Sequence, residues 1–138
     1  MEEITINNTV GYSNKLKVLY VEDDKELQAQ SKDLFEIIFA SVTTADNGSI
    51  ALELYKKESY DIILSDIEMP SMDGIELTQE IKKINPHQSI IIISAHNDSV
   101  YLQKFINLNV DQFISKPFDT HNILYAIYTV SKKINPFL

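Results

Sequence analysis

Apolar residues gather in five short runs along the chain, and most of these runs are followed by a segment with helical spacing. The runs cover residues 16–21, 41–45, 61–65, 89–94 and 110–115. Four successive isoleucines at 90–93 show no alternation, which indicates a strand that is buried on both faces. Between the runs, apolar residues recur three or four positions apart, as in amphipathic helices. The pattern predicts alternating strands and helices, and hence a parallel sheet with right-handed crossovers.

Capping residues and breaks in the pattern delimit the expected elements. Asp24, Asp98 and either Asp119 or Thr120 can each cap the start of a helix. Residues 1–14 are polar, rich in asparagine and aperiodic, so we expect a flexible N-terminal arm. We expect one domain over residues 15–134, and a tail or the start of a linker at residues 135–138.

Composition narrows the classes of protein that the chain could represent. A chain of 138 residues with 44% hydrophobic residues has the size and composition of one globular domain. The net charge is −8, and the twelve basic residues are scattered lysines, which argues against direct binding to nucleic acid. The chain has no cysteine, no apolar run near the roughly 20 residues of a membrane span, and no basic, apolar leader at its start. We therefore expect a cytoplasmic protein without a membrane partner.

Chemically active side chains follow the predicted strands. Glu22 and Asp23 follow the first strand, Asp66 the third and Lys116 the fifth, and Ser94 ends the fourth. Because parallel strands present their carboxyl ends along one edge, we expect these side chains to converge. Clustered carboxylates repel one another unless a cation is present, and Mg²⁺ prefers such oxygen ligands. A nearby lysine ammonium is suited to binding a phosphate.

This arrangement resembles the receiver domain of bacterial two-component response regulators, from residue 15 to about 133. The resemblance rests on the acidic pair, on Asp66 with Met69-Pro70 and Asp73-Gly74 behind it, on the hydroxyl after the fourth strand, and on Lys116-Pro117. It implies an α/β fold of the chemotaxis-regulator type. That fold is a doubly wound, flavodoxin-like sheet of five parallel strands in the order 2-1-3-4-5.

The resemblance also implies a role for each pocket residue. Asp66 would be the phosphoacceptor, and Lys116 and Ser94 would bind the phosphoryl oxygens. Mg²⁺, with Mn²⁺ as a substitute, would be held by Asp66, by Asp23 directly, by Glu22 through water, and by the backbone carbonyl of Glu68.

Further positions follow from the same family pattern. Ser94 and Phe113 would form the conformational switch, and the peptide bond between Lys116 and Pro117 would be cis. Ala95 and His96 would border the mouth of the pocket. Asn109 stands where the family usually has glycine, and asparagine tolerates the left-handed backbone that this position needs.

The implied function is phosphorelay signalling. The domain would receive a phosphoryl group from a sensor histidine kinase or a histidine phosphotransfer protein. It would phosphorylate and dephosphorylate itself rather than turn over external substrates. Phosphorylation would switch the face formed by the helix after Asp98, the strand at 110–115 and the last helix, which would then bind a second copy or a target. The apolar residues that we expect to be exposed on this face are Tyr101, Leu102, Tyr125 and Tyr128.

Two other interpretations remain open. The first is a metal-dependent phosphatase or phosphotransferase, because Asp66-Ile67-Glu68 superficially resembles the Asp-x-Asp motif of haloacid-dehalogenase-like enzymes. Against this, 138 residues leave no room for a cap domain, and Pro70 stands where those enzymes have a hydroxyl or small residue. The second is a degenerate receiver that binds partners constitutively, which the presence of Asp66, Asp23, Ser94 and Lys116 disfavours.

Overall fold

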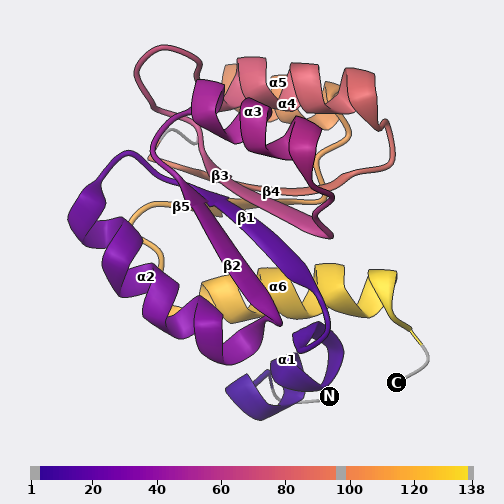
Figure 1. The fold of residues 1–138 in the computed structure, drawn as a ribbon. Helices are drawn as coiled ribbons and strands as arrows, with labels where there is room; N and C mark the ends of the chain where they lie inside the picture. The colour runs from indigo at the N-terminus through magenta and orange to yellow at the C-terminus, as the bar shows by residue number, and fades with distance from the viewer. Residues whose placement is uncertain (1–3, 96–98, 137–138) are drawn as a thin grey trace.

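Five parallel strands form the centre of the molecule, with helices on both sides (Figure 1). The computed structural model describes residues 4–95 and 99–136, and side chains up to residue 95 and from residue 103. The strands are β1 Lys17–Val21, β2 Ser41–Ala45, β3 Ile62–Asp66, β4 Ser89–Ser94 and β5 Gln112–Ser115. The helices are α1 Ile6–Ser13, α2 Lys25–Ile38, α3 Gly48–Lys57, α4 Gly74–Ile84, α5 Ser99–Asn107 and α6 Thr120–Ile134.

The strand order is β2-β1-β3-β4-β5, which confirms the doubly wound topology predicted from the sequence. The chain moves outward from β1 to β2, returns across the sheet to β3, and then adds β4 and β5 on the other side. In the register, Val21 at the end of β1 lies beside Ser65, and Asp66 at the end of β3 lies beside Ile93. This alignment brings the carboxyl ends of β1, β3 and β4 to one edge of the sheet.

Each face of the sheet carries its own hydrophobic core. Ile91 and Ile93 point to the side covered by α2 and α6, whereas Ile90 and Ile92 point to the side covered by α3, α4 and α5 (Figure 1). All four isoleucines are fully buried, which confirms the prediction made from the unbroken apolar run. Because helices cover both faces of the sheet, the chemically active side chains lie at the carboxyl ends of the strands.

The predicted helix caps are present where the structure describes them. The Asp24 carboxylate accepts hydrogen bonds from the backbone N–H groups of Glu26 and Leu27, and Asp119 caps α6 in the same way through Asn122. Asn109 adopts the expected left-handed backbone, with φ of 61°. The proposed cap at Asp98 lies outside the described residues.

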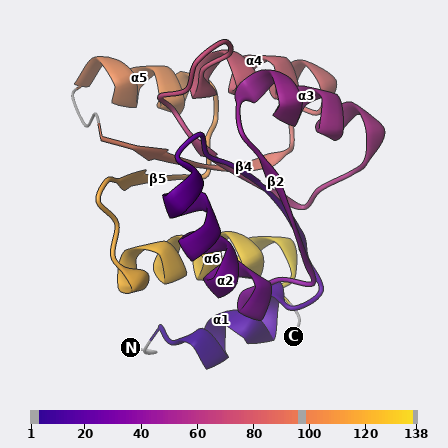
Figure 2. The ribbon, with the colours of Figure 1, turned by 60° about the vertical axis from the view of Figure 1, so that its left-hand side comes forward.

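The expectation of a flexible arm at residues 1–14 is wrong for most of that segment, because residues 6–13 form α1. The Thr5 hydroxyl caps this helix by accepting the N–H of Asn8 at 3.1 Å. The Ser13 hydroxyl donates to the carbonyl of Ile38 at 2.8 Å, and α1 packs outside α6 and the end of α2 (Figure 2). These long-range contacts order the segment, and a short polar sequence gives no periodicity from which to predict them.

The same contacts overturn the expectation that Tyr128 is exposed. Its ring packs edge-on against Tyr12 of α1, with 5.3 Å between the ring centroids, and only 7% of the residue is exposed. The ammonium group of Lys132 lies 5.7 Å from the centroid of the Tyr128 ring. Helix α1 therefore covers a part of α6 that the sequence pattern assigned to a partner. No helix within the described residues is both long and apolar enough to cross a membrane.

Candidate functional site

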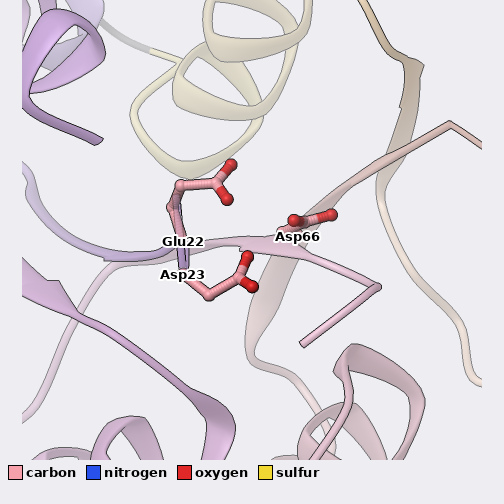
Figure 3. A group of neighbouring side chains, drawn as sticks. All are labelled: Glu22, Asp23 and Asp66. Carbon is pink, nitrogen blue, oxygen red and sulfur yellow. The ribbon is translucent and has the colours of Figure 1, made fainter. Parts of the chain in front are cut away.

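Three carboxylates meet where β1 and β3 end (Figure 3). Glu22 and Asp23 follow β1, Asp66 is the last residue of β3, and one oxygen of each lies within 4.8 Å of the others. Glu22 is completely buried and Asp66 is 3% exposed, whereas Asp23 faces solvent. The convergence that the strand-end pattern predicted is therefore present, and it combines two buried acids with one accessible acid.

Lys116 brings the compensating charge from the end of β5. Its ammonium nitrogen lies 2.9 Å from Asp66 Oδ2 and 3.2 Å from Glu22 Oε1. The backbone N–H of Lys116 donates to the carbonyl of Ser94 at 2.8 Å, which anchors the residue to the end of β4. The peptide bond between Lys116 and Pro117 is cis, as the resemblance implied. The amine thus reaches across the sheet to acids that are 50 and 94 positions away in the sequence.

Backbone groups hold Asp66 from the other side. The N–H of Glu68 donates to Asp66 Oδ1 at 3.3 Å, so each carboxylate oxygen of Asp66 has a donor. The loop after Asp66 turns back so closely that a Cβ atom on Gly74 would lie 2.6 Å from the carbonyl oxygen of Asp66. Glycine at position 74 therefore permits the loop to close beneath the acid, which gives a physical reason for the Asp73-Gly74 motif.

The pocket contains more acidic than basic side chains. Burial, together with the neighbouring charge of Asp66, raises the pKa of Glu22 to about 7. Burial would lower the pKa of Lys116, but its hydrogen bond to Asp66 and the charges of Asp66 and Glu22 outweigh this effect and raise the pKa. One ammonium group thus faces two buried carboxylates, and Asp23 adds a third acid beside them.

The donor set fits a hard divalent cation. Mg²⁺ prefers carboxylate, carbonyl and water oxygens, and it commonly retains several waters. Two buried acids and one accessible acid provide such oxygens beside open solvent, and their mutual repulsion favours a bound cation. Glu68 lies two residues after Asp66, and its backbone carbonyl remains a predicted fourth oxygen. The role of each oxygen in metal binding stays a prediction.

The other predicted residues lie around this cluster as far as the structure describes them. Ser94 is fully buried at the end of β4, and Ala95 after it is exposed. Phe113 is half-buried and packs against Phe105 of α5, with 5.4 Å between the ring centroids. His96 lies outside the described residues. The proposed switch pair therefore occupies β4 and β5 beside the pocket.

A groove of about 650 Å³ opens next to Lys116, and the sequence pattern did not predict it. Its walls come from α2 and from the loop between β5 and α6. Apolar side chains line much of it, namely Leu27, Leu34, Pro117 and Phe118. The groove could not be predicted from the sequence, because its shape depends on how the loop after Lys116 lies against α2.

The face formed by α5, β5 and α6 is partly apolar. Tyr125 is 52% exposed, as predicted, and with Phe113 and His121 it lines a second groove of about 350 Å³. Ile106 of α5 is 71% exposed, although it was not among the residues expected to be exposed. The side chains of Tyr101 and Leu102 lie outside the described part of the structure.

A parallel α/β sheet with an acid cluster and a lysine at its carboxyl edge is the arrangement that the resemblance to receiver domains implied. Residues 18–128 match the model of the response regulator receiver domain. The chain belongs to this family.

Curated relatives include several chemotaxis proteins. The chain is 38% identical over 112 residues to the chemotaxis protein CheY of Bacillus subtilis, with 80% of this chain and 93% of that protein covered. It is 36% identical over 117 residues to CheY of Thermotoga maritima, with 84% and 98% covered. Receiver domains of this kind are signalling modules that use acidic residues to bind Mg²⁺.

Solved structures agree with the fold. A receiver domain of a Francisella response regulator matches with a TM-score of 0.80 at 30% identity, covering 88% of this chain and all of that one. A complex described as CheX-CheY-BeF3-Mg+2, from Borrelia burgdorferi, matches with a TM-score of 0.79 at 26% identity, covering 88% and 97%. The fold class predicted from the sequence is thereby confirmed.

Proposed function

We propose that this receiver accepts a phosphoryl group on Asp66 from a phosphohistidine of a sensor kinase or histidine phosphotransfer protein. A carboxylate oxygen of Asp66 attacks phosphorus, the P–N bond to the donor breaks, and its electron pair stays on the imidazole nitrogen. The product is an acyl phosphate, which water later hydrolyses. The observation that carries this proposal is the meeting of Glu22, Asp23 and Asp66 within 4.8 Å, with Lys116 at 2.9 Å from Asp66.

Each side chain has a task in this reaction. Mg²⁺ or Mn²⁺, held by Glu22, Asp23, Asp66 and the Glu68 carbonyl, would neutralise charge on the phosphoryl oxygens. The Lys116 ammonium, which is paired with Asp66, can move to a phosphoryl oxygen as the negative charge there develops. The Ser94 hydroxyl would bond another of these oxygens.

The groove beside Lys116 suits the phosphodonor protein. Leu27 and Leu34 of α2 line it together with Pro117 and Phe118, so an apolar helix of the donor would pack there. A histidine on that helix would then lie next to Lys116 and Asp66. Donor recognition and chemistry would thus share one edge of the sheet.

The face of α5, β5 and α6 suits the output. Tyr125 is exposed there, and it lines a groove together with Phe113. We propose that phosphorylation moves Ser94 and Phe113 and thereby creates a binding surface for a second copy or for a target. A target of the kind seen in the Borrelia complex with CheX is one candidate.

Incubation with acetyl phosphate and Mg²⁺ tests the phosphoacceptor role. A receiver accumulates about one phosphoryl group per chain, which intact-protein mass spectrometry measures. Rapid turnover of many equivalents would instead indicate a phosphatase, and an absence of labelling would indicate a degenerate receiver.

Sedimentation of the beryllofluoride-treated protein, alone and with candidate targets, tests the output surface. Association should appear on activation and should weaken in Tyr101→Ala and Tyr125→Ala variants. If neither substitution changes the association, or if no association occurs, the output surface lies elsewhere.

A further inference from the structure

Gln28 of α2 places its side-chain amide against the backbone that carries the acidic pair. Its Nε2 lies 2.9 Å from the carbonyl oxygen of Glu22 and 3.1 Å from Asp46 Oδ1, with the Ala45 carbonyl at 3.4 Å. All three neighbours are acceptors, so the nitrogen rather than the oxygen of the amide must face them. Gln28 is half-buried, and it ends the first turn of the helix that Asp24 caps.

This contact completes the restraint of Glu22. The N–H of Glu22 donates to the Ala45 carbonyl at 3.0 Å, and its carboxylate oxygens accept from Lys116 and from the N–H of Asp24. The carbonyl of Glu22 is the remaining polar group, and Gln28 is its partner. These bonds hold Glu22 at both ends of its backbone and at both oxygens of its side chain.

The hydrogen bond to the Glu22 carbonyl also restrains the orientation of Asp23. The carbonyl of Glu22 and the nitrogen of Asp23 belong to one planar peptide unit, so fixing the oxygen fixes the orientation of that plane. The direction of the Asp23 side chain depends on this plane. Because Asp23 is exposed, packing does little to keep its carboxylate beside those of Glu22 and Asp66.

Repulsion makes such a restraint necessary. Two ionised acids at short range disfavour each other, so an unrestrained Asp23 would turn toward water in the metal-free protein. A cation would then bind only after the loop had been reordered, and the cost of that ordering would weaken binding. A donor on the rigid helix α2 avoids this cost, because it orients the ligand before the cation arrives.

We propose that Gln28 is a positioning residue of the metal site, which orients the Glu22–Asp23 peptide so that the Asp23 carboxylate faces Asp66. This inference rests on the proposed function, in which these acids hold Mg²⁺. Replacing a residue that orients a metal ligand typically lowers the affinity for the metal about 10- to 100-fold. Gln28→Leu removes the amide and keeps much of the side-chain volume, so we expect Mg²⁺ affinity to fall within that range.

Two features of the chain supply matched controls. Gln30→Leu makes the same change at an exposed position two residues further along α2. Lys25→Met removes the 2.6 Å ion pair with Asp46 and leaves the Gln28 contact with Glu22 in place. Both controls should bind Mg²⁺ within about twofold of the parent. Gln28→Asn serves as a second test variant, because it stays polar but is one methylene too short to reach the Glu22 carbonyl.

The experiment is a calorimetric titration of the parent and of each variant with MgCl₂, together with a measurement of its melting temperature in EDTA. The proposal expects a weaker dissociation constant for Gln28→Leu and Gln28→Asn and near-parental values for the controls. A lower metal-free melting temperature with an unchanged dissociation constant would show that Gln28 contributes only to stability, and would overturn the proposal. Equal weakening in Gln30→Leu would overturn it as well. If the parent itself binds no Mg²⁺, the metal site of the proposed function has failed instead.

Discussion

At the amino ends of β1, β3 and β4, polar groups meet complementary partners, whereas at the carboxyl ends two buried carboxylates share one ammonium group and a third carboxylate lies beside them. The amino-end network centres on Gln88, which is 5% exposed. Its amide accepts the Tyr55 hydroxyl at 2.7 Å and donates to the carbonyl of Asp61 at 3.1 Å. The Asp61 carboxylate in turn accepts the backbone N–H of Lys17 at 2.8 Å.

At the carboxyl end, acidic side chains outnumber their basic partner. Glu22 and Asp66 are both buried, both face Lys116, and have Asp23 beside them. Burial and the charge of Asp66 raise the pKa of Glu22 to about 7, which indicates that its ionised form is disfavoured there. A network built for stability would pair each of these charges, as the amino end pairs its polar groups.

The contrast separates residues that stabilise the sheet from residues that serve the reaction. Excess acid at one edge disfavours the empty pocket and favours the binding of a cation and a phosphoryl group. The two ends can therefore be distinguished by substitution. Changes at the carboxyl end should alter ligand binding and phosphorylation, while changes at the amino end should alter stability alone.

The largest expected effect is on phosphorylation. Asp66→Asn removes the nucleophilic carboxylate, so labelling with acetyl phosphate and Mg²⁺ should be lost completely, as measured by intact-protein mass spectrometry. Asp61→Asn makes the same change at the amino end and should leave labelling at the parental level. Undiminished labelling of Asp66→Asn would exclude this residue as the acceptor.

The next effect concerns pH in metal-free buffer. Burial and the charge of Asp66 raise the pKa of Glu22 to about 7 in the folded protein, whereas its pKa in the unfolded chain is about 4.5. The folded state therefore binds more protons between these values, and the free energy of unfolding should fall as the pH rises through them. The loss attributable to Glu22 is up to about 3 kcal/mol, at about 1.4 kcal/mol per pKa unit.

Urea denaturation in EDTA at a series of pH values measures this loss. Glu22→Gln cannot ionise and should flatten the profile between pH 4.5 and 7. An equally steep profile in that variant would assign the pH dependence to other groups.

Magnesium should stabilise the protein by a similar amount. A ligand that binds only the folded state adds about 2.7 kcal/mol at a concentration of 100 times its dissociation constant. The melting temperature should therefore rise with millimolar MgCl₂, and Asp23→Ala should remove most of the rise. Asp33→Ala, at an exposed position on α2, should retain it. A melting temperature that ignores Mg²⁺ would mean that the acids form no site.

The smallest effect belongs to the amino end. Gln88→Leu removes the amide that bonds both the Tyr55 hydroxyl and the Asp61 carbonyl, which should cost about 1–2 kcal/mol in the free energy of unfolding. Mg²⁺ affinity should not change, because the site lies at the other end of the strands. Gln79→Leu, on the exposed side of α4, should alter neither quantity. A change in Mg²⁺ affinity for Gln88→Leu would show that the two ends are coupled.

The sequence by itself determined the sheet and the identity of the pocket residues. Four successive isoleucines are buried on alternate faces because a strand reverses its side-chain direction at each residue, and this follows from local chemistry. Acids placed directly after apolar runs must lie at the carboxyl edge of a parallel sheet. The convergence of Glu22, Asp23, Asp66 and Lys116 could therefore be predicted from strand periodicity and from the family pattern.

Long-range packing decided the features that the sequence did not predict. Helix α1 and the burial of Tyr128 arise from contacts between the first and the last helix, more than 100 residues apart, and neither segment signals the other. The sequence pattern identifies Gln28 only as a helix residue. The fold places the Glu22 carbonyl 2.9 Å from its amide nitrogen. Local periodicity is a property of neighbouring residues, so it predicts strands and helices. Which distant side chain completes a hydrogen bond or covers a face depends on the three-dimensional path of the chain.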